Sequence, residues 1–134
     1  MTVSYSTTCR NAMLDAVTTT IGASGLFRIY DGTPPASANA ALAGNTLLAE
    51  LALSATYAAA ASGGVLTANS IANDAAADAT GTASFYRIYK SDGTTCVEQG
   101  TVSTSGADCN LNTTSIVIGG PVAISSKTFT AGNP

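Results

Sequence analysis

Apolar residues near the start of the chain recur at steps of three and four positions. Between Ser6 and Ile21 they form one stripe, which consists of Cys9, Ala12, Met13, Ala16, Val17 and Ile21. This spacing predicts an amphipathic helix. Ser6 or Thr7 can cap its start, and Gly22 can end it in a left-handed conformation. We expect the stripe to pack on a sheet of the same chain, with docking on a partner as the alternative.

The period of the pattern changes to two after Gly25. The segments "LFRIY" (26–30) and "FYRIY" (85–89) alternate as half-buried strands do, and an Asp-Gly pair soon follows each. The residues predicted to face inward are Phe27, Ile29, Tyr86 and Ile88. The residues predicted to face outward are Arg28, Tyr30, Arg87 and Tyr89. Two Arg-Tyr pairs would then form one contact patch on an otherwise uncharged surface.

The rest of the chain alternates between further strands and turns rich in Gly, Ser, Asn and Asp. Segment 46–61 fits a helix or a strand, and its β context favours a strand. Other strands are expected at 65–72, 82–91, 96–104, 111–120 and 121–131. About seven or eight short strands with frequent turns are typical of a β-sandwich. We predict a single domain over 1–134, with a helix at about 6–21 and a jelly-roll-like or Greek-key sandwich at about 25–131.

The chain has three cysteines, Cys9, Cys96 and Cys109, and an odd number argues against a disulfide framework. We expect Cys96 and Cys109 to lie on the two arms of a hairpin that turns near 105–106. In that register they would stand roughly 20 Å apart, at about 3.3 Å per residue. A disulfide needs Cα atoms within about 7 Å of each other. All three thiols are therefore predicted to be free.

Charged residues make up only 10% of the chain, whereas globular domains carry about 25%. A surface with so little charge favours a protein that partners cover in an assembly. The alternative is a soluble domain whose surface is rich in Ser and Thr. The net charge is −3, and the five basic residues are scattered. Nucleic acid and anionic membranes both select clustered cations, so neither is expected as a partner. No secretory signal or membrane-spanning segment is recognisable, which predicts synthesis in a cytoplasm without secretion.

The residue types that carry most enzyme chemistry are absent or dispersed. The chain has no histidine, the commonest general base and metal ligand, and it contains no phosphate-binding glycine motif. Asp74 and Asp78 lie in one predicted loop, but they lack the spacing of a calcium loop. We expect no catalysis, no cofactor, no metal and no small-molecule substrate.

Tyrosine is the best candidate for contacts with a partner, because it combines a large apolar ring with a polar tip. The alternative is that most tyrosines are half-buried residues of the sheet. The predicted interface residues are Tyr5, Arg28, Tyr30, Tyr57, Arg87 and Tyr89.

Nearly the whole chain resembles a family of small virion proteins of tailed bacteriophages. The most specific segments are "LFRIYDG" (26–32), "ATGTASF" (79–85) and "LNTTSI" (111–116). By fold-level analogy, the resemblance implies a cement or decoration protein on the outer capsid surface. Its expected partners are the major capsid protein and further copies of itself, and the host bacterial cytoplasm would be its place of synthesis.

Two other functions stay open at this point. One is a tail, baseplate or tube component, for which 82–104 is the only candidate for a long hairpin. The other is a receptor- or carbohydrate-binding β-module, which needs exposed aromatic residues on loops. The location of the protein in the particle would discriminate between these functions.

Overall fold

The computed structural model describes residues 3–131. One helix, α1 (Thr7–Ile21), precedes the strands of this region. The strands are β1 (Leu26–Tyr30), β2 (Leu47–Ala52), β3 (Val65–Thr67), β4 (Gly81–Thr82), β5 (Phe85–Tyr89), β6 (Cys96–Ser103), β7 (Cys109–Leu111), β8 (Ser115–Ile116) and β9 (Ile124–Thr130). The prediction of a mainly β fold with one N-terminal helix is confirmed.

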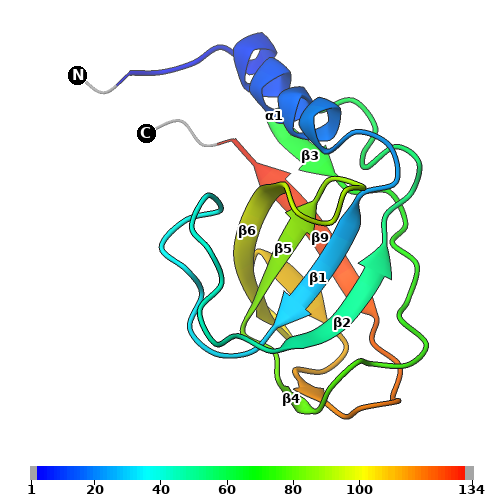
Figure 1. Ribbon diagram of the computed structural model, residues 1–134. Helices are drawn as coiled ribbons and strands as arrows, with labels where there is room; N and C mark the ends of the chain where they lie inside the picture. The colour runs from blue at the N-terminus through cyan, green and yellow to red at the C-terminus, as the bar shows by residue number, and fades with distance from the viewer. Residues whose placement is uncertain (1–2, 132–134) are drawn as a thin grey trace.

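Seven strands form one sheet, in the order β2-β1-β5-β6-β7-β9-β3, and β4 pairs with β8 in a second, two-stranded sheet. The large sheet curls, with α1 at one end of the molecule and β4 near the other (Figure 1). Backbone hydrogen bonds join the segment after the edge strand β3 to the end of the other edge strand, β2, and to the segment after it. They run from Ala72 N to Ala52 O at 3.3 Å and from Asn69 N to Tyr57 O at 2.8 Å. A jelly-roll-like or Greek-key sandwich is therefore not confirmed, because the core lies within one curled sheet.

The two similar segments form neighbouring strands. β1 and β5 pair antiparallel, with Phe27 opposite Ile88 and Arg28 opposite Arg87. The predicted inward set is confirmed, since Phe27, Ile29, Tyr86 and Ile88 are all fully buried. We call their side of the sheet the inner face and the side of Arg28 and Arg87 the outer face. The repeated sequence thus reflects two paired strands with one packing role.

Both predicted ends of the helix are confirmed. The Ser6 Oγ accepts a hydrogen bond from Cys9 N at 3.2 Å, and Gly22 ends α1 with a φ of 72°. The predicted buried stripe, however, is wrong at Cys9, Ala12, Met13 and Ala16, whose side chains are exposed. The side that packs on the sheet carries Leu14, Val17 and Ile21 instead.

Polar contacts explain why the helix is rotated away from its predicted orientation. Arg10 Nε donates to Ala131 O at 2.8 Å, and Gly64 N donates to Asn11 Oδ1 at 2.8 Å. Ala61 N donates to Asp15 Oδ1 at 2.7 Å. These hydrogen bonds satisfy backbone groups near β3 and at the end of β9, and they outweigh the burial of four small or flexible apolar side chains.

Several strand predictions need correction. Regular strand occupies only Leu47–Ala52 of segment 46–61 and Val65–Thr67 of segment 65–72. In segment 111–120 it occupies only Leu111, at the end of β7, and Ser115–Ile116. β6 and β7 were expected as the arms of a hairpin, but they run parallel, with Val102 opposite Cys109. The Asp108 carboxylate accepts hydrogen bonds from Thr101 N at 2.8 Å and Thr101 Oγ1 at 2.9 Å. This contact folds 104–108 back beside β6, so that β7 starts alongside the end of β6.

Candidate functional site

A row of four polar side chains crosses the outer face of the sheet. By strand register, Glu50 of β2 stands opposite Arg28 of β1, Arg28 opposite Arg87 of β5, and Arg87 opposite Gln99 of β6. Like charges directly opposite each other destabilise a sheet. The Arg28–Arg87 pair is tolerated because each guanidinium has its own acceptors.

Arg28 is partly exposed and has three partners. Its Nε donates to Glu50 Oε2 at 2.6 Å, and its Nη1 donates to Gly93 O at 2.8 Å. Its guanidinium carbon also lies 4.9 Å from the centre of the Tyr89 ring. Burial alone would lower the pKa of Arg28, but the hydrogen bond and charge of Glu50 outweigh it, so the pKa is raised. Arg28 thus ties β1 to β2 and to the β5–β6 turn.

Arg87 is buried and holds a loop against the sheet. Its Nε donates to Gln99 Oε1 at 2.9 Å, and its Nη2 donates to Ser37 O at 3.1 Å and Ala40 O at 2.7 Å. Gln99 Nε2 adds a hydrogen bond to Pro35 O at 2.8 Å. Within the described residues Arg87 has no carboxylate in ion-pair distance. Its neutral acceptors fix the loop 33–45 over the outer face.

Two tyrosines lie beside the arginines under this loop. The Tyr30 and Tyr89 hydroxyls are 3.5 Å apart, and Phe85 stacks on Tyr30 with ring centres 5.3 Å apart. Leu26, Leu42, Leu47 and Cys96 pack around these rings. Burial, followed by the contact with Tyr89, raises the pKa of Tyr30 far above its ordinary value. The Tyr30 phenol is therefore neutral at physiological pH.

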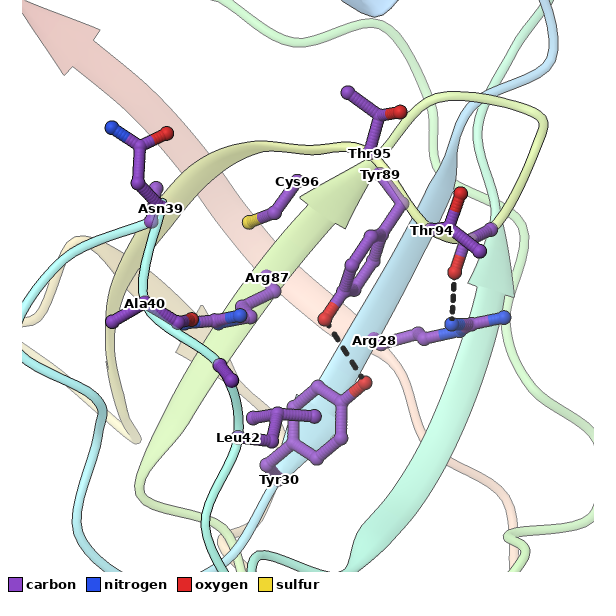
Figure 2. A pocket seen from close by; sticks show the side chains of 13 residues that line it. Arg28, Tyr30, Asn39, Ala40, Leu42, Arg87, Tyr89, Thr94, Thr95 and Cys96 are labelled. Carbon is purple, nitrogen blue, oxygen red and sulfur yellow. Dashed lines mark hydrogen bonds between the residues drawn. The ribbon is translucent and has the colours of Figure 1, made fainter.

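A pocket of about 530 Å³ opens between the loop segment 38–42 and the turn 93–96. Figure 2 shows Arg28, Arg87, Tyr30 and Tyr89 in its lining. No aspartate or glutamate lines this pocket among the described residues. Burial raises the pKa of the Cys96 thiol, despite the opposing charge of Arg87, so Cys96 is not an activated nucleophile. The groups present can bind a polar or aromatic ligand, but they do not supply an acid-base pair.

Four of the six predicted interface residues come together here, but not as an exposed patch. Tyr30, Arg87 and Tyr89 are buried and Arg28 is partly exposed. The prediction that they decorate the surface is wrong. It treated 33–45 as a loop but did not foresee that this loop packs on the outer face and covers these side chains. Pro34 and Pro35 marked the loop, while Leu42, its single large apolar residue, gave the only signal that it packs on the sheet.

The other two predicted residues lie elsewhere. Tyr57 is buried in the main core, and burial, followed by the charges of Glu98 and Cys109, raises its pKa well above the ordinary range. A buried Tyr57 cannot contact a partner. Tyr5 is exposed on the segment before α1, as an interface residue must be.

Sequence reasoning missed a polar cluster on the inner face. Lys127 of β9 is buried, and its Nζ lies 2.6 Å from Glu98 Oε1. The Tyr86 hydroxyl donates a hydrogen bond to the same Glu98 oxygen. The alternation of "ISSKTFT" (124–130) contains the signal for this buried lysine. In a strand, the side chains at 126 and 128 point to the opposite face from Lys127, so Lys127 faces the core when they face solvent.

Large apolar side chains are exposed at two ends of the molecule. Val117 and Ile118, just after β8, are 60% and 63% exposed. Met13 of α1 and Phe129 near the end of β9 are also exposed. Figure 1 shows α1 and the end of β9 at one end of the molecule, far from β4, which pairs with β8. Contiguous exposed apolar side chains, such as the adjacent Val117 and Ile118, are typical of surfaces that bind other proteins.

Within residues 3–131, no group of three or more His, Cys, Asp or Glu side chains is placed to hold a metal ion. No helix in this range has the length and apolarity needed to cross a bilayer. Comparison of the chain with protein-family models, curated proteins and solved structures gave no match.

Proposed function

We propose that this protein is a non-enzymatic structural protein of a bacteriophage virion, and that it acts as a cement protein on the outer capsid surface. The observation that supports this proposal is the presence of exposed apolar side chains at both ends of a sparsely charged molecule. A protein that fastens neighbouring capsid subunits must contact two of them at once. Met13 and Phe129 at one end and Val117 and Ile118 at the other supply two separate contacts.

The energetics fit a stabiliser that works by binding. A protein that binds the assembled shell and not its dissociated subunits stabilises the shell by mass action. Each contact is small, but repetition over a symmetric surface multiplies it. The partners are the major capsid protein and further copies of this chain.

The rigid outer face supports the same role. Arg87 and Gln99 fix the loop 33–45 through backbone carbonyls. The loop therefore keeps one shape before binding, which lowers the entropy cost of association.

The tail and tube alternatives have less support. A tube subunit needs a long hairpin that joins a ring, but the β5–β6 hairpin lies inside the sheet between β1 and β7. A carbohydrate-binding module needs an aromatic platform. Tyr5 and Phe129 are the exposed aromatic residues among positions 3–131, and neither lines the pocket between 38–42 and 93–96.

The test combines location with stability. Particles with and without the protein are imaged, and their rupture temperatures are measured. We expect density on the capsid exterior and a lower rupture temperature in its absence. Density on the tail, or no protein in purified particles, would overturn the proposal.

Substitutions at each end test the two-contact geometry. Val117→Ser with Ile118→Ser should abolish the gain in rupture temperature while leaving the fold intact, because these side chains are exposed. Met13→Ser should weaken binding from the other end. Thr104→Ser, on the exposed segment between β6 and β7, is the matched control and should bind like the wild type.

A further inference from the structure

The inner face of the sheet holds a lysine and a glutamate in direct contact and away from solvent. Lys127 Nζ lies 2.6 Å from Glu98 Oε1, and the two side chains are 2% and 12% exposed. At this short distance, Nζ still has no hydrogen bond of normal geometry to any described residue. The contact is therefore close without being a satisfied ion pair, which is an expensive arrangement for a buried charge.

The groups around the pair favour a reaction between them. Tyr86 donates its hydroxyl proton to Glu98 Oε1 in a hydrogen bond. The Tyr86 and Phe129 ring centres lie 5.1 Å and 5.5 Å from Lys127 Nζ. Burial, followed by the charge of Glu98, raises the pKa of Tyr86 far above its ordinary value. The phenol thus stays protonated and is available as a fixed donor.

We propose that Lys127 and Glu98 condense after folding into an intramolecular amide bond that links β9 to β6. The carboxyl C–O bond is about 1.2 Å long. With Nζ 2.6 Å from Oε1, the Glu98 Cδ can lie no more than about 4 Å from Nζ. This is close to the separation at which bonds form between fixed reactants, about 3–3.5 Å. The fold itself supplies the approach.

The condensation needs no external reagent. One proton passes from the ammonium to the carboxylate, which leaves a neutral amine and a carboxylic acid. The Nζ lone pair then attacks Cδ, a C–N bond forms, and the carbonyl electron pair moves onto oxygen, where the Tyr86 hydroxyl stabilises it. The electron pair returns to re-form the carbonyl, one C–O bond breaks, and the hydroxyl leaves as water with a proton from nitrogen. No atom is oxidised or reduced.

The second ion pair of the structure lacks these conditions. Arg28 Nε also lies 2.6 Å from a carboxylate oxygen, that of Glu50, but the side chains are 22% and 38% exposed. An arginine stays protonated and has no free electron pair for the attack. The reaction is therefore specific to the inner face, and it is independent of the proposed role in a capsid.

The decisive experiment is the mass of the purified, denatured chain. We expect it to be lower than the sequence mass by one water molecule. A protease that cuts before aspartate would then cleave before Asp92 and Asp108, which lie on either side of the segment 92–107 that contains Glu98. Fragments 92–107 and 108–134 should remain covalently joined, since the second contains Lys127.

The digestion also excludes the main competing explanation of a lost water. Asp31-Gly32 and Asp92-Gly93 are sites at which an aspartate can cyclise with its own backbone and lose water. Cyclisation at either site would leave fragment 108–134 separate from the fragment that contains Glu98. An unchanged intact mass, or a lost water with separate fragments, would overturn the proposal.

Three variants sharpen the assignment. Lys127→Met should restore the full mass and separate the fragments. Tyr86→Phe keeps the ring and removes the hydroxyl, so the amide should form about 10²-fold more slowly after refolding. Lys90→Met, in the β5–β6 turn, is the matched control and should leave the joined fragments unchanged. If Lys90→Met also separated them, the assignment to Lys127 would fail.

Discussion

Two ion pairs in this protein have the same nitrogen–oxygen distance of 2.6 Å and very different surroundings. Arg28–Glu50 lies on the outer face, where both side chains reach solvent. Lys127–Glu98 lies on the inner face, almost without exposure. Water screens the outer pair, so its contribution to the free energy of unfolding is small. The inner pair has left water, so each charge depends on the other.

The two regions also differ in how they satisfy their remaining polar atoms. On the outer face, Arg28 and Arg87 donate to backbone carbonyls of turns and loops. On the inner face, Lys127 Nζ has no hydrogen-bond acceptor of normal geometry among residues 3–131. Distance alone therefore does not indicate what a charged pair does. Burial and the remaining partners decide whether it positions a loop or reacts.

The thiols provide the largest contrast between the two regions. Cys96 lies at the outer pocket and is half-buried, whereas Cys109 lies fully buried on the inner face. Burial raises the pKa of Cys109 to about 12. Cys109 should react only when the core opens, so we expect it to label on the order of 10²-fold or more slowly than Cys96. Mass-resolved alkylation measures both rates, with exposed Cys9 as the internal reference; equal rates would remove the contrast.

Among the charged residues of the two faces, breaking the inner pair should have the largest effect on stability. Lys127→Met leaves the Glu98 carboxylate buried without a cation, which should cost about 3–5 kcal/mol in the free energy of unfolding. Urea denaturation measures the loss. The double variant Lys127→Met with Glu98→Leu should recover the part of the loss that comes from the unpaired carboxylate, because no unpaired charge remains. It should not recover the part that comes from the missing amide. A loss below about 1 kcal/mol would place this pair with the surface ion pairs.

Alkaline pH should weaken the inner region through Cys109. Its pKa rises from an ordinary value of 9.0 to about 12 on folding, because burial disfavours the thiolate. A raised folded pKa contributes stability that is complete below pH about 9 and disappears as the pH rises toward about 12. Cys109→Ala should therefore show a shallower loss of stability over this interval. An identical slope in both proteins would contradict the prediction.

The outer face gives a smaller effect at its buried arginine. Arg87→Met removes the donor for Gln99 Oε1 and for the carbonyls of Ser37 and Ala40. We expect a loss of about 1–3 kcal/mol and faster proteolysis within the loop 33–45. Denaturation and limited digestion measure the two results. Lys90→Met, which removes a cation from the neighbouring turn, should change neither.

Sequence patterns predicted most of the elements because local rules control them. The alternation in 26–30 and 85–89 follows from the period of a strand, and the Ser6 cap and the Gly22 end follow from backbone chemistry. The rotation of α1 was not predictable from its apolar stripe. Long-range hydrogen bonds of Arg10, Asn11 and Asp15 determine it.

The candidate sites were predictable only in part. That Arg28 and Arg87 share a face followed from alternation, but that they stand opposite each other depends on the β1–β5 register, which pairs residues 59 positions apart. The loop that buries Tyr30 and Tyr89 has no periodic pattern. Lys127 and Glu98 meet because the sheet curls, and curvature is a property of the whole sheet.

The exposed ion pair should give the smallest effect. Glu50→Gln removes the charge opposite Arg28 but leaves its hydrogen bond to Gly93 O and its contact with the Tyr89 ring. Because solvent reaches both side chains, we expect a change below about 1 kcal/mol, which high salt should reduce further. Denaturation at low and high ionic strength, compared with Lys127→Met under the same conditions, measures the difference. A salt-independent loss of several kcal/mol for Glu50→Gln would mean that the outer pair also depends on desolvated charges, and the distinction between the two faces would fail.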